Sequence, residues 1–155
     1  MSSSARRIAE QLLAPNRPAP PLRPKRPYST ELKDNINSLR DPAPIRAALH
    51  LANDDVDSAH DTAQSDQGTS TSDYVHAQLH RREGDYWNSK WWLGTGMKQS
   101  HPILDQMHGG FKEGKVFVDR CEGVGKGKSS DGELEKKQWE EIKATVEYAL
   151  EHDAK

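Results

Sequence analysis

The feature that most constrains the fold is an internal repeat in the middle of the chain. The segment AALHLANDDVDSA (47–59) aligns with AQLHRREGDYWNS (77–89) at an offset of thirty residues. The identical pairs are Ala47 and Ala77, Leu49 and Leu79, His50 and His80, and Asp55 and Asp85. Each copy contains a helical pattern, a polar turn and an aspartate, then a bulky residue followed three positions later by a small one. This spacing is typical of a helical hairpin, because the small residue lets two helices approach closely.

The repeat predicts two helical hairpins between residues 42 and 93. Pro44 suits the first turn of the first helix, and the segment DDVDSAHDTAQ supplies its partner. The third helix should begin near Asp73 and end at Gly84, and residues 85–93 should form the fourth. The turn EGDYWNSKWW resembles that of a tetratricopeptide repeat. Arrays of that kind need about three units, so another element must complete the core.

A long helix near the C-terminus can complete it. Ser130 and Glu133 form a capping box, and apolar residues follow at helical spacing: Leu134, Ile142, Val146, Ala149 and Leu150. We expect a helix from about Asp131 to His152 that packs on the hairpins. The predicted fold class is all-α, with short tetratricopeptide-like hairpins closed by this C-terminal helix.

Composition predicts that the folded part is smaller than the whole chain. Only 33% of the residues are apolar and 30% are charged. Residues 1–28 are basic and rich in proline, which predicts a disordered N-terminal arm. Residues 29–155 are expected to form a single helical domain with flexible linkers at 66–72 and 122–130. The segment KVFVDRC (115–121) is typical of a short strand or a buried turn.

Bulk properties narrow the compartment and the partners. Cys121 is the only cysteine, so an intramolecular disulfide is excluded and a reducing compartment is expected. We expect the cytoplasm or the nucleus in preference to the mitochondrion, although the Ser- and Arg-containing start has some presequence character. No apolar run approaches the roughly 18 residues of a membrane span. The net charge of −2 gives no general attraction to nucleic acid, so the expected partner is a protein or a small polar ligand.

Histidines in and around the second copy of the repeat are candidates for a metal site. His76 and His80 are four residues apart on a predicted helix, so their imidazoles lie on one face and can chelate a divalent ion such as Zn, Fe or Mn. His60, Glu83 and His101 could complete the roughly four ligands that zinc requires. The segment HAQLH lacks the glutamate that marks zinc peptidases. The alternative is that one histidine packs in the core and the other is solvated.

The charged and aromatic residues nearby also have two interpretations. A free guanidinium of Arg81 or Arg82 would bind a carboxylate or a phosphate, whereas pairing within the chain would stabilise the hairpin turn, with Asp85 capping the next helix. Trp87 and Trp91 share a helical face and Trp92 points elsewhere, so one ring can be exposed while others form core.

This segment also resembles one found in a group of small fungal and bacterial proteins of uncharacterised activity, in which an HRREGDYWNSKWW-like sequence is followed by His-Pro. The matching residues here are His80, Arg81, Arg82, Glu83, Asp85, Asn88, Lys90, Trp91, His101 and Pro102. Asp57, His60 and Gln64 upstream, and FVDRC at 117–121, are similar as well. The resemblance covers about residues 40–150 and implies a common fold, but no reaction.

Two functions follow from these patterns. The first is a helical binding or adaptor protein with a polar His/Arg/Glu pocket, whose candidate ligand-binding residues are His60, Arg81, Arg82, Asp85, Asn88 and Trp91. The alternative is a small metal-dependent or acid-base enzyme that uses His60, His76, His80, Glu83 and His101, with His76, His80, Glu83 and His101 as candidate metal ligands. We expect the histidines and Glu83 to share one pocket, with His101 near its rim. The repeat-like scaffold favours the binder, and the density of ionisable groups favours the enzyme.

Overall fold

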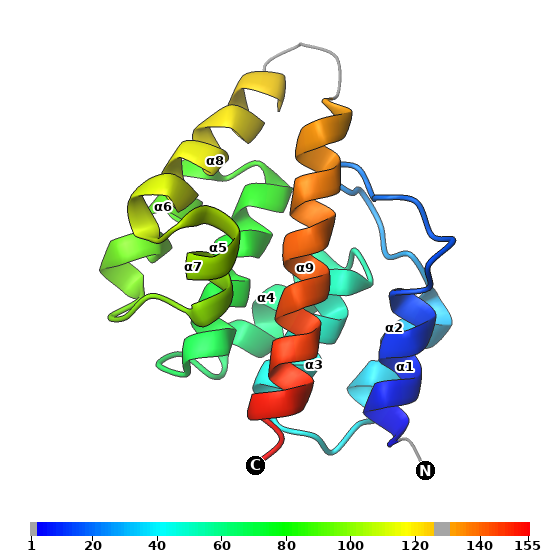
Figure 1. Cartoon of the computed structure of the whole chain (residues 1–155). Helices are drawn as coiled ribbons and strands as arrows, with labels where there is room; N and C mark the ends of the chain where they lie inside the picture. The colour runs from blue at the N-terminus through cyan, green and yellow to red at the C-terminus, as the bar shows by residue number, and fades with distance from the viewer. Residues whose placement is uncertain (1–2, 126–130) are drawn as a thin grey trace.

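The computed structural model describes residues 3–125 and 131–155, and these residues form only helices, turns and irregular segments (Figure 1). The elements are α1 (Ser4–Leu12), α2 (Thr30–Asn37), α3 (Ala43–Ala52), α4 (Val56–Gln64), α5 (Ser70–Glu83), α6 (Tyr86–Trp91), the turn η1 (Trp92–Gly96), α7 (Pro102–His108), α8 (Phe111–Gly125) and α9 (Gly132–His152). The predicted all-α fold class is confirmed. Within the described ranges, none of the helices has the length and apolar character of a membrane span.

The two predicted hairpins are present, as α3–α4 and α5–α6, and their turns share one geometry. Asp55 caps α4 with φ −97° and ψ 80°, and Asp85 caps α6 with φ −94° and ψ 74°. The backbone N–H of Asp55 donates to the carbonyl of His50 at 3.0 Å, and that of Asp85 donates to the carbonyl of His80 at 2.9 Å. The internal repeat of the sequence is therefore a repeat of turn structure. Gly84 ends α5 in the left-handed conformation, as predicted.

Helix α9 covers the hairpins and completes the main core. In Figure 1 it runs through the centre of the molecule, beside α3 and α1. Its residues Trp139, Ile142 and Val146 are buried in one cluster with apolar residues of α1, α3, α4 and α5. The prediction that a long C-terminal helix closes the core is thus confirmed. Its N-cap is Asp131, whose carboxylate accepts the N–H of Glu133 at 2.9 Å, whereas the predicted cap Ser130 lies outside the described residues.

The predicted disorder of residues 1–28 is wrong for residues 3–28. Helix α1 buries Ala5, Ile8 and Leu12, which are spaced to form one apolar face. The guanidinium of Arg17 is buried and donates to the carbonyls of Leu12 and Ala52, each at 2.8 Å. The proline-rich composition did not predict this packing, because a few well-spaced apolar residues and one buried arginine are enough to attach the segment to the core.

The predicted linkers and the KVFVDRC segment also differ from expectation. Helix α5 begins at Ser70, inside the expected 66–72 linker, and the N–H of Gly68 donates to the Asp73 carboxylate at 3.1 Å. Residues 122–125 continue α8, whereas residues 126–130 lie outside the described residues. The KVFVDRC segment lies within α8 and forms neither a strand nor a turn, because Phe117 and Cys121 bury one face of that helix.

Candidate metal centre

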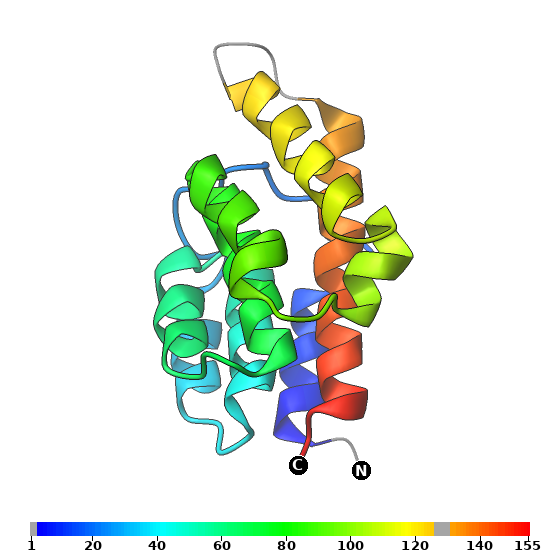
Figure 2. The ribbon, with the colours of Figure 1, turned by 90° about the vertical axis from the view of Figure 1, so that its left-hand side faces the viewer.

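Three histidines meet between α4 and α5, which lie side by side (Figure 2). His60 comes from α4, and His76 and His80 come from successive turns of α5. One possible ligand nitrogen from each ring lies within 4.8 Å of the other two. The small residues Ala59 and Ala63 are fully buried, which allows the two helices to approach this closely. The predicted grouping of His60, His76 and His80 is therefore observed.

The spacing of the three rings matches that of a tetrahedral metal site. Zinc binds imidazole nitrogen at about 2.0–2.1 Å, which puts ring centroids about 3.2 Å from the ion and about 5.2 Å from one another. The centroid of His60 lies 4.9 Å from that of His76 and 5.5 Å from that of His80. The centroids of His76 and His80 are 4.8 Å apart. One ion would need ligand nitrogens about 3.3 Å apart. Here they lie within 4.8 Å of one another, so the side chains would draw closer on binding.

His76 is in the protonation state that a metal ligand needs. The residue is 2% exposed, and its Nδ1 has no hydrogen-bond partner among the described residues. Burial, with smaller contributions from His80 and His60, lowers the pKa of His76 to about 3. The ring is thus neutral near pH 7 and carries a basic lone pair, because only the neutral imidazole can coordinate a metal.

Glu83 orients His80. Its Oε1 lies 2.8 Å from Nδ1 of His80, and in the neutral ring this contact favours the tautomer with the proton on Nδ1 and the lone pair on Nε2. A carboxylate that accepts from the second nitrogen of a histidine is the usual support of a histidine ligand in metal proteins. Asp85 is also near, since one of its oxygens lies within 4.8 Å of the candidate ligand atoms of both His80 and Glu83. Glu83 thus joins the site as a partner of His80 in place of a direct ligand.

The centre is closed on one side and open on another. The indole of Trp92 stacks on His76, with ring centroids 4.1 Å apart and an interplanar angle of 23°. Trp91 meets Trp92 edge-on, at 5.2 Å and 86°. In contrast, the side chain of His60 is 36% exposed. An ion held by the three rings would therefore be accessible from the His60 side.

His101 does not join the cluster, contrary to prediction. It caps α7, where its Nδ1 accepts the N–H of Ile103 at 3.1 Å. Its Nε2 lies 2.9 Å from the hydroxyl of Thr71, and its ring stacks on Tyr74. Both nitrogens are therefore used within the fold. The physical reason is the helical period: Tyr74 and His76 are two residues apart on α5, so they point to different sides of the helix.

The two arginines are buried in pairs within the chain. Arg81 donates to Glu141 at 2.8 Å and to Gln138 at 3.0 Å. Arg82 donates to Asp54 at 2.6 Å and to the carbonyl of Leu51 at 2.8 Å. This arrangement matches the structural interpretation of the pair: both guanidinium groups are buried and paired, and Nε of Arg82 is the one fully buried nitrogen of the two groups that has no hydrogen-bond partner among the described residues.

The remaining ligand-binding candidates lie on α6 or at its start. Asp85 caps this helix, and its carboxylate also accepts from the side-chain amide of Asn88 at 3.3 Å. Trp87 and Trp91 are 72% and 39% exposed, whereas Trp92 is buried. Asp85 and Asn88 therefore serve the hairpin turn, and the candidate that remains available to a ligand is Trp91.

A buried ionic centre was missed by sequence reasoning. Glu141 of α9 is fully buried, accepts a hydrogen bond from the Tyr74 hydroxyl, and lies 3.2 Å from Nε2 of His108. Burial favours its neutral form, but Arg81, His108 and Tyr74 outweigh burial and lower the pKa of Glu141 to about 2. The sequence feature that could have indicated this centre is a stripe of polar residues, Gln138 and Glu141, on the predicted C-terminal helix. Tyr74 and Arg81 both donate to the Glu141 carboxylate, so we assign this centre a structural role.

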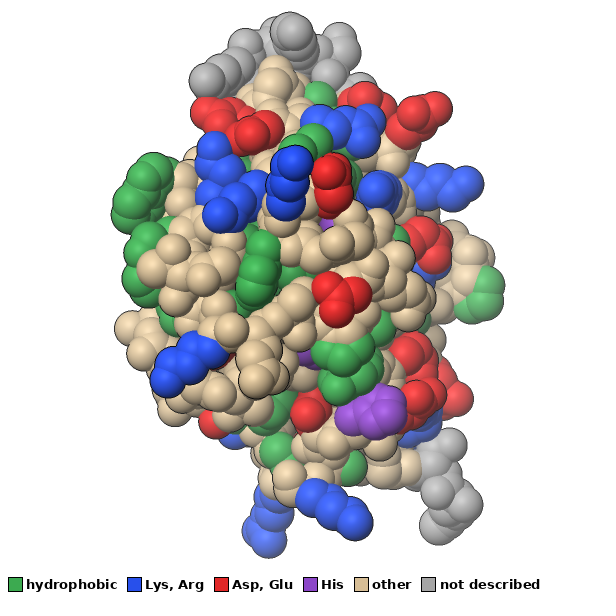
Figure 3. Space-filling model, turned by 60° about the vertical axis from the view of Figure 1, so that its left-hand side comes forward, with side chains coloured by type: hydrophobic (Ala, Val, Ile, Leu, Met, Phe, Trp, Pro, Cys, Tyr) green, Lys and Arg blue, Asp and Glu red, His purple; other side chains and the backbone are tan. Residues whose placement is uncertain are grey.

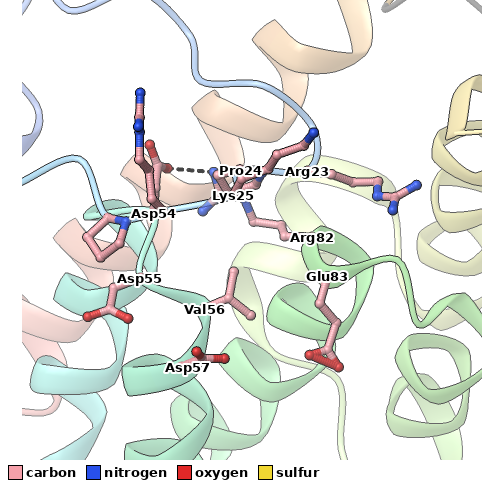
Figure 4. A pocket seen from close by; sticks show the side chains of 11 residues that line it. Arg23, Pro24, Lys25, Asp54, Asp55, Val56, Asp57, Arg82 and Glu83 are labelled. Atoms are coloured by element: carbon pink, nitrogen blue, oxygen red, sulfur yellow. Dashed lines mark hydrogen bonds and ion pairs between the residues drawn. The ribbon is translucent and has the colours of Figure 1, made fainter.

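Two cavities lie near the ends of α5. One, of about 580 Å³, lies between the acidic start of α4 and the basic segment 23–27. Figure 4 shows Asp57 and Glu83 on one side of it and Arg23 and Lys25 on the other. The second, of about 590 Å³, is lined by residues that include Trp92.

The molecular face in Figure 3 mixes acidic and basic side chains, without a broad basic surface of the kind that binds nucleic acid.

Comparison with known proteins gives no information about the histidine site. No protein-family model, curated protein or solved structure matches the chain. The resemblance of residues 80–92 to the small fungal and bacterial proteins therefore stays a prediction, as does the tetratricopeptide-like character of the hairpins.

Proposed function

We propose that the protein binds one divalent transition-metal ion, of the zinc class, through His60, His76 and His80. The observation that carries this proposal is the triangle of imidazoles with centroid separations of 4.8, 4.9 and 5.5 Å. The buried Nδ1 of His76, which has no hydrogen-bond partner among the described residues, and the Glu83 carboxylate that contacts His80 support it independently.

Three histidine ligands favour a reactive site over a purely structural one. Structural zinc sites are usually closed by four protein ligands, whereas catalytic sites have three and keep a position for water or substrate. The metal would supply a bound hydroxide near neutral pH, because it lowers the pKa of bound water to about 7. In this chain His60, His76 and His80 would hold the ion, Glu83 would orient His80, and Trp92 would shield one side. We therefore propose metal-dependent hydrolysis or hydration as the activity.

The test of metal binding is a titration of chelator-treated protein with Zn²⁺, Mn²⁺ and Fe²⁺, followed by calorimetry and elemental analysis. We expect one zinc ion per chain. His60→Gln, His76→Ala and His80→Ala should each weaken zinc binding strongly, whereas His152→Ala should not, because that side chain is 56% exposed and outside the cluster. His60→Gln is the variant least able to disturb folding, since His60 is half-exposed. Zinc binding that is unchanged in His60→Gln and His80→Ala would refute the proposal.

A second candidate function is ligand binding without catalysis, and the cavity beside Trp92 favours it. A zinc-loaded protein that hydrolyses a simple activated ester such as p-nitrophenyl acetate no faster than the His60→Gln variant would favour this second function. A zinc-dependent rate that disappears in the variant would favour the hydrolytic one.

A further inference from the structure

A cavity of about 590 Å³ lies beside the metal centre and shares only Trp92 with it. Its walls come from η1 and the residues after it, from the end of α6, and from the start of α5. The residues used below are Trp91, Trp92, Gly96, Asp73 and Lys98, all of which line this cavity. Its volume suits a small molecule and is too small for a folded partner.

Two tryptophans form an aromatic corner in this cavity. Their rings are nearly perpendicular, at 86°, with centroids 5.2 Å apart. A Cβ at Gly96 would lie 2.3 Å from Cε3 of Trp92 and 2.7 Å from Cζ3 of Trp91. Only glycine therefore permits this backbone to pass so close to both indoles. Trp91 keeps 39% of its surface exposed, so its ring is available to a ligand.

Asp73 adds a buried negative charge to the same cavity. It is 6% exposed, and the one donor to its carboxylate among the described residues is the backbone N–H of Gly68, at 3.1 and 3.2 Å. Among the described residues, no lysine or arginine forms an ion pair with it. Burial raises the pKa of Asp73, and the neighbouring Asp66 raises it further against the opposing hydrogen bond from Gly68. A cationic ligand would stabilise this carboxylate, because a buried charge is costly unless it is paired.

We propose that this cavity binds an organic cation with a quaternary or alkylated ammonium head group. Tryptophan faces attract such cations more strongly than other aromatic rings do, and a nearby carboxylate supplies the counter-charge. Lys98 is the one lysine or arginine among the described lining residues, and it is exposed, so it opposes the cation from the solvent side. The inference does not depend on a bound metal, since the cavity and the histidine cluster are separate sites.

The test uses choline and its neutral isostere 3,3-dimethyl-1-butanol, each titrated into chelator-treated full-length protein with tryptophan fluorescence and calorimetry as readouts. We expect choline to bind at least about threefold more tightly than the isostere, given the usual size of cation–π interactions. Repeating the titration with zinc-loaded protein separates the two sites, because choline binding should persist whether or not zinc binds.

Variants identify the site. Asp73→Asn and Trp91→Ala should each weaken choline binding several-fold, and Lys98→Ala should strengthen it. Trp87→Ala is the matched control, since Trp87 is on the same helix as Trp91 but does not line the cavity. Asp73→Asn keeps an oxygen that can accept from Gly68, so it should fold normally. Equal affinity for the two ligands, or choline binding that survives both Asp73→Asn and Trp91→Ala unchanged, would overturn the proposal.

Discussion

Glu83 Oε1 lies 2.8 Å from Nδ1 of His80, one turn away on the same helix, and in the neutral ring this contact favours a lone pair on Nε2. Loss of such a supporting carboxylate typically costs about 10- to 100-fold in metal affinity. We therefore expect Glu83→Ala to weaken zinc binding by that factor, and Glu83→Gln to have a smaller effect because it keeps an acceptor oxygen. Competition with a chromogenic chelator measures both. Glu31→Ala, an exposed change on α2, is the control, and equal affinities of Glu83→Ala and the wild type would contradict this role.

Metal binding should stabilise the fold. An ion that binds only the native chain adds about 2.7 kcal/mol when its free concentration is about 100 times Kd. For a chain of this size that gain raises Tm by roughly 5–10 °C. Differential scanning fluorimetry with zinc, then with excess chelator, should show the rise and its reversal. His60→Gln should show no rise, and the same rise in this variant would mean that zinc stabilises the protein elsewhere.

Buried histidines should make the metal-free protein sensitive to acid. Burial lowers the pKa of both His50 and His101 from 6.5 to about 4. Between pH 6.5 and pH 4 the unfolded chain therefore binds more protons than the native chain. The contribution of these histidines to the free energy of unfolding is fully present above pH 6.5 and is lost as the pH falls toward 4. Each histidine should contribute about 1.4 kcal/mol of this loss per pH unit. Urea unfolding at about pH 7.5 and about pH 5.5, with chelator present, measures it. An unchanged midpoint would contradict it.

The N-terminal segment should contribute to stability through Arg17. This buried guanidinium forms an ion pair with Asp54 at 2.9 Å and lies 3.8 Å from the centre of the Tyr28 ring. Removal of one partner of a buried pair usually costs about 3–5 kcal/mol, and we expect about 3 because Asp54 keeps its contact with Arg82. Denaturant unfolding of Arg17→Ala, compared with Arg26→Ala at an exposed position of the same segment, measures the difference. Equal stability of the two variants would mean that the segment is only loosely attached.

Local sequence rules predicted the hairpins well. The aspartate before each second helix produced the same capped turn twice, because a side chain that accepts the N–H three residues on is a local feature of the chain. The pairing of His76 with His80 followed from the helical period alone. The position of His60 required a further inference, that α4 and α5 are neighbours and that Ala59 and Ala63 let them touch.

The errors concern contacts between distant segments. No residue near Arg17 in the sequence indicates that its guanidinium would bind Asp54 and the end of α3. The proline-rich composition predicted instead that this segment is exposed to solvent. The position of the His101 ring is likewise determined by Thr71, thirty residues earlier, with which it forms a 2.9 Å hydrogen bond. Glu141 is buried only because Arg81, Tyr74 and His108 converge from three other positions. Such sites depend on tertiary packing, which periodicity along a single helix does not encode.

The most direct measurement of the central claim is X-ray absorption at the zinc edge of the loaded protein, compared with the His60→Gln variant. The three-histidine centre predicts three imidazole nitrogens at about 2.0–2.1 Å and one further light ligand. The variant should lose one imidazole or lose the zinc altogether. A zinc ion surrounded by water and carboxylate oxygens, or by the same number of imidazoles in the variant as in the wild type, would contradict the assignment of His60, His76 and His80 as the metal site.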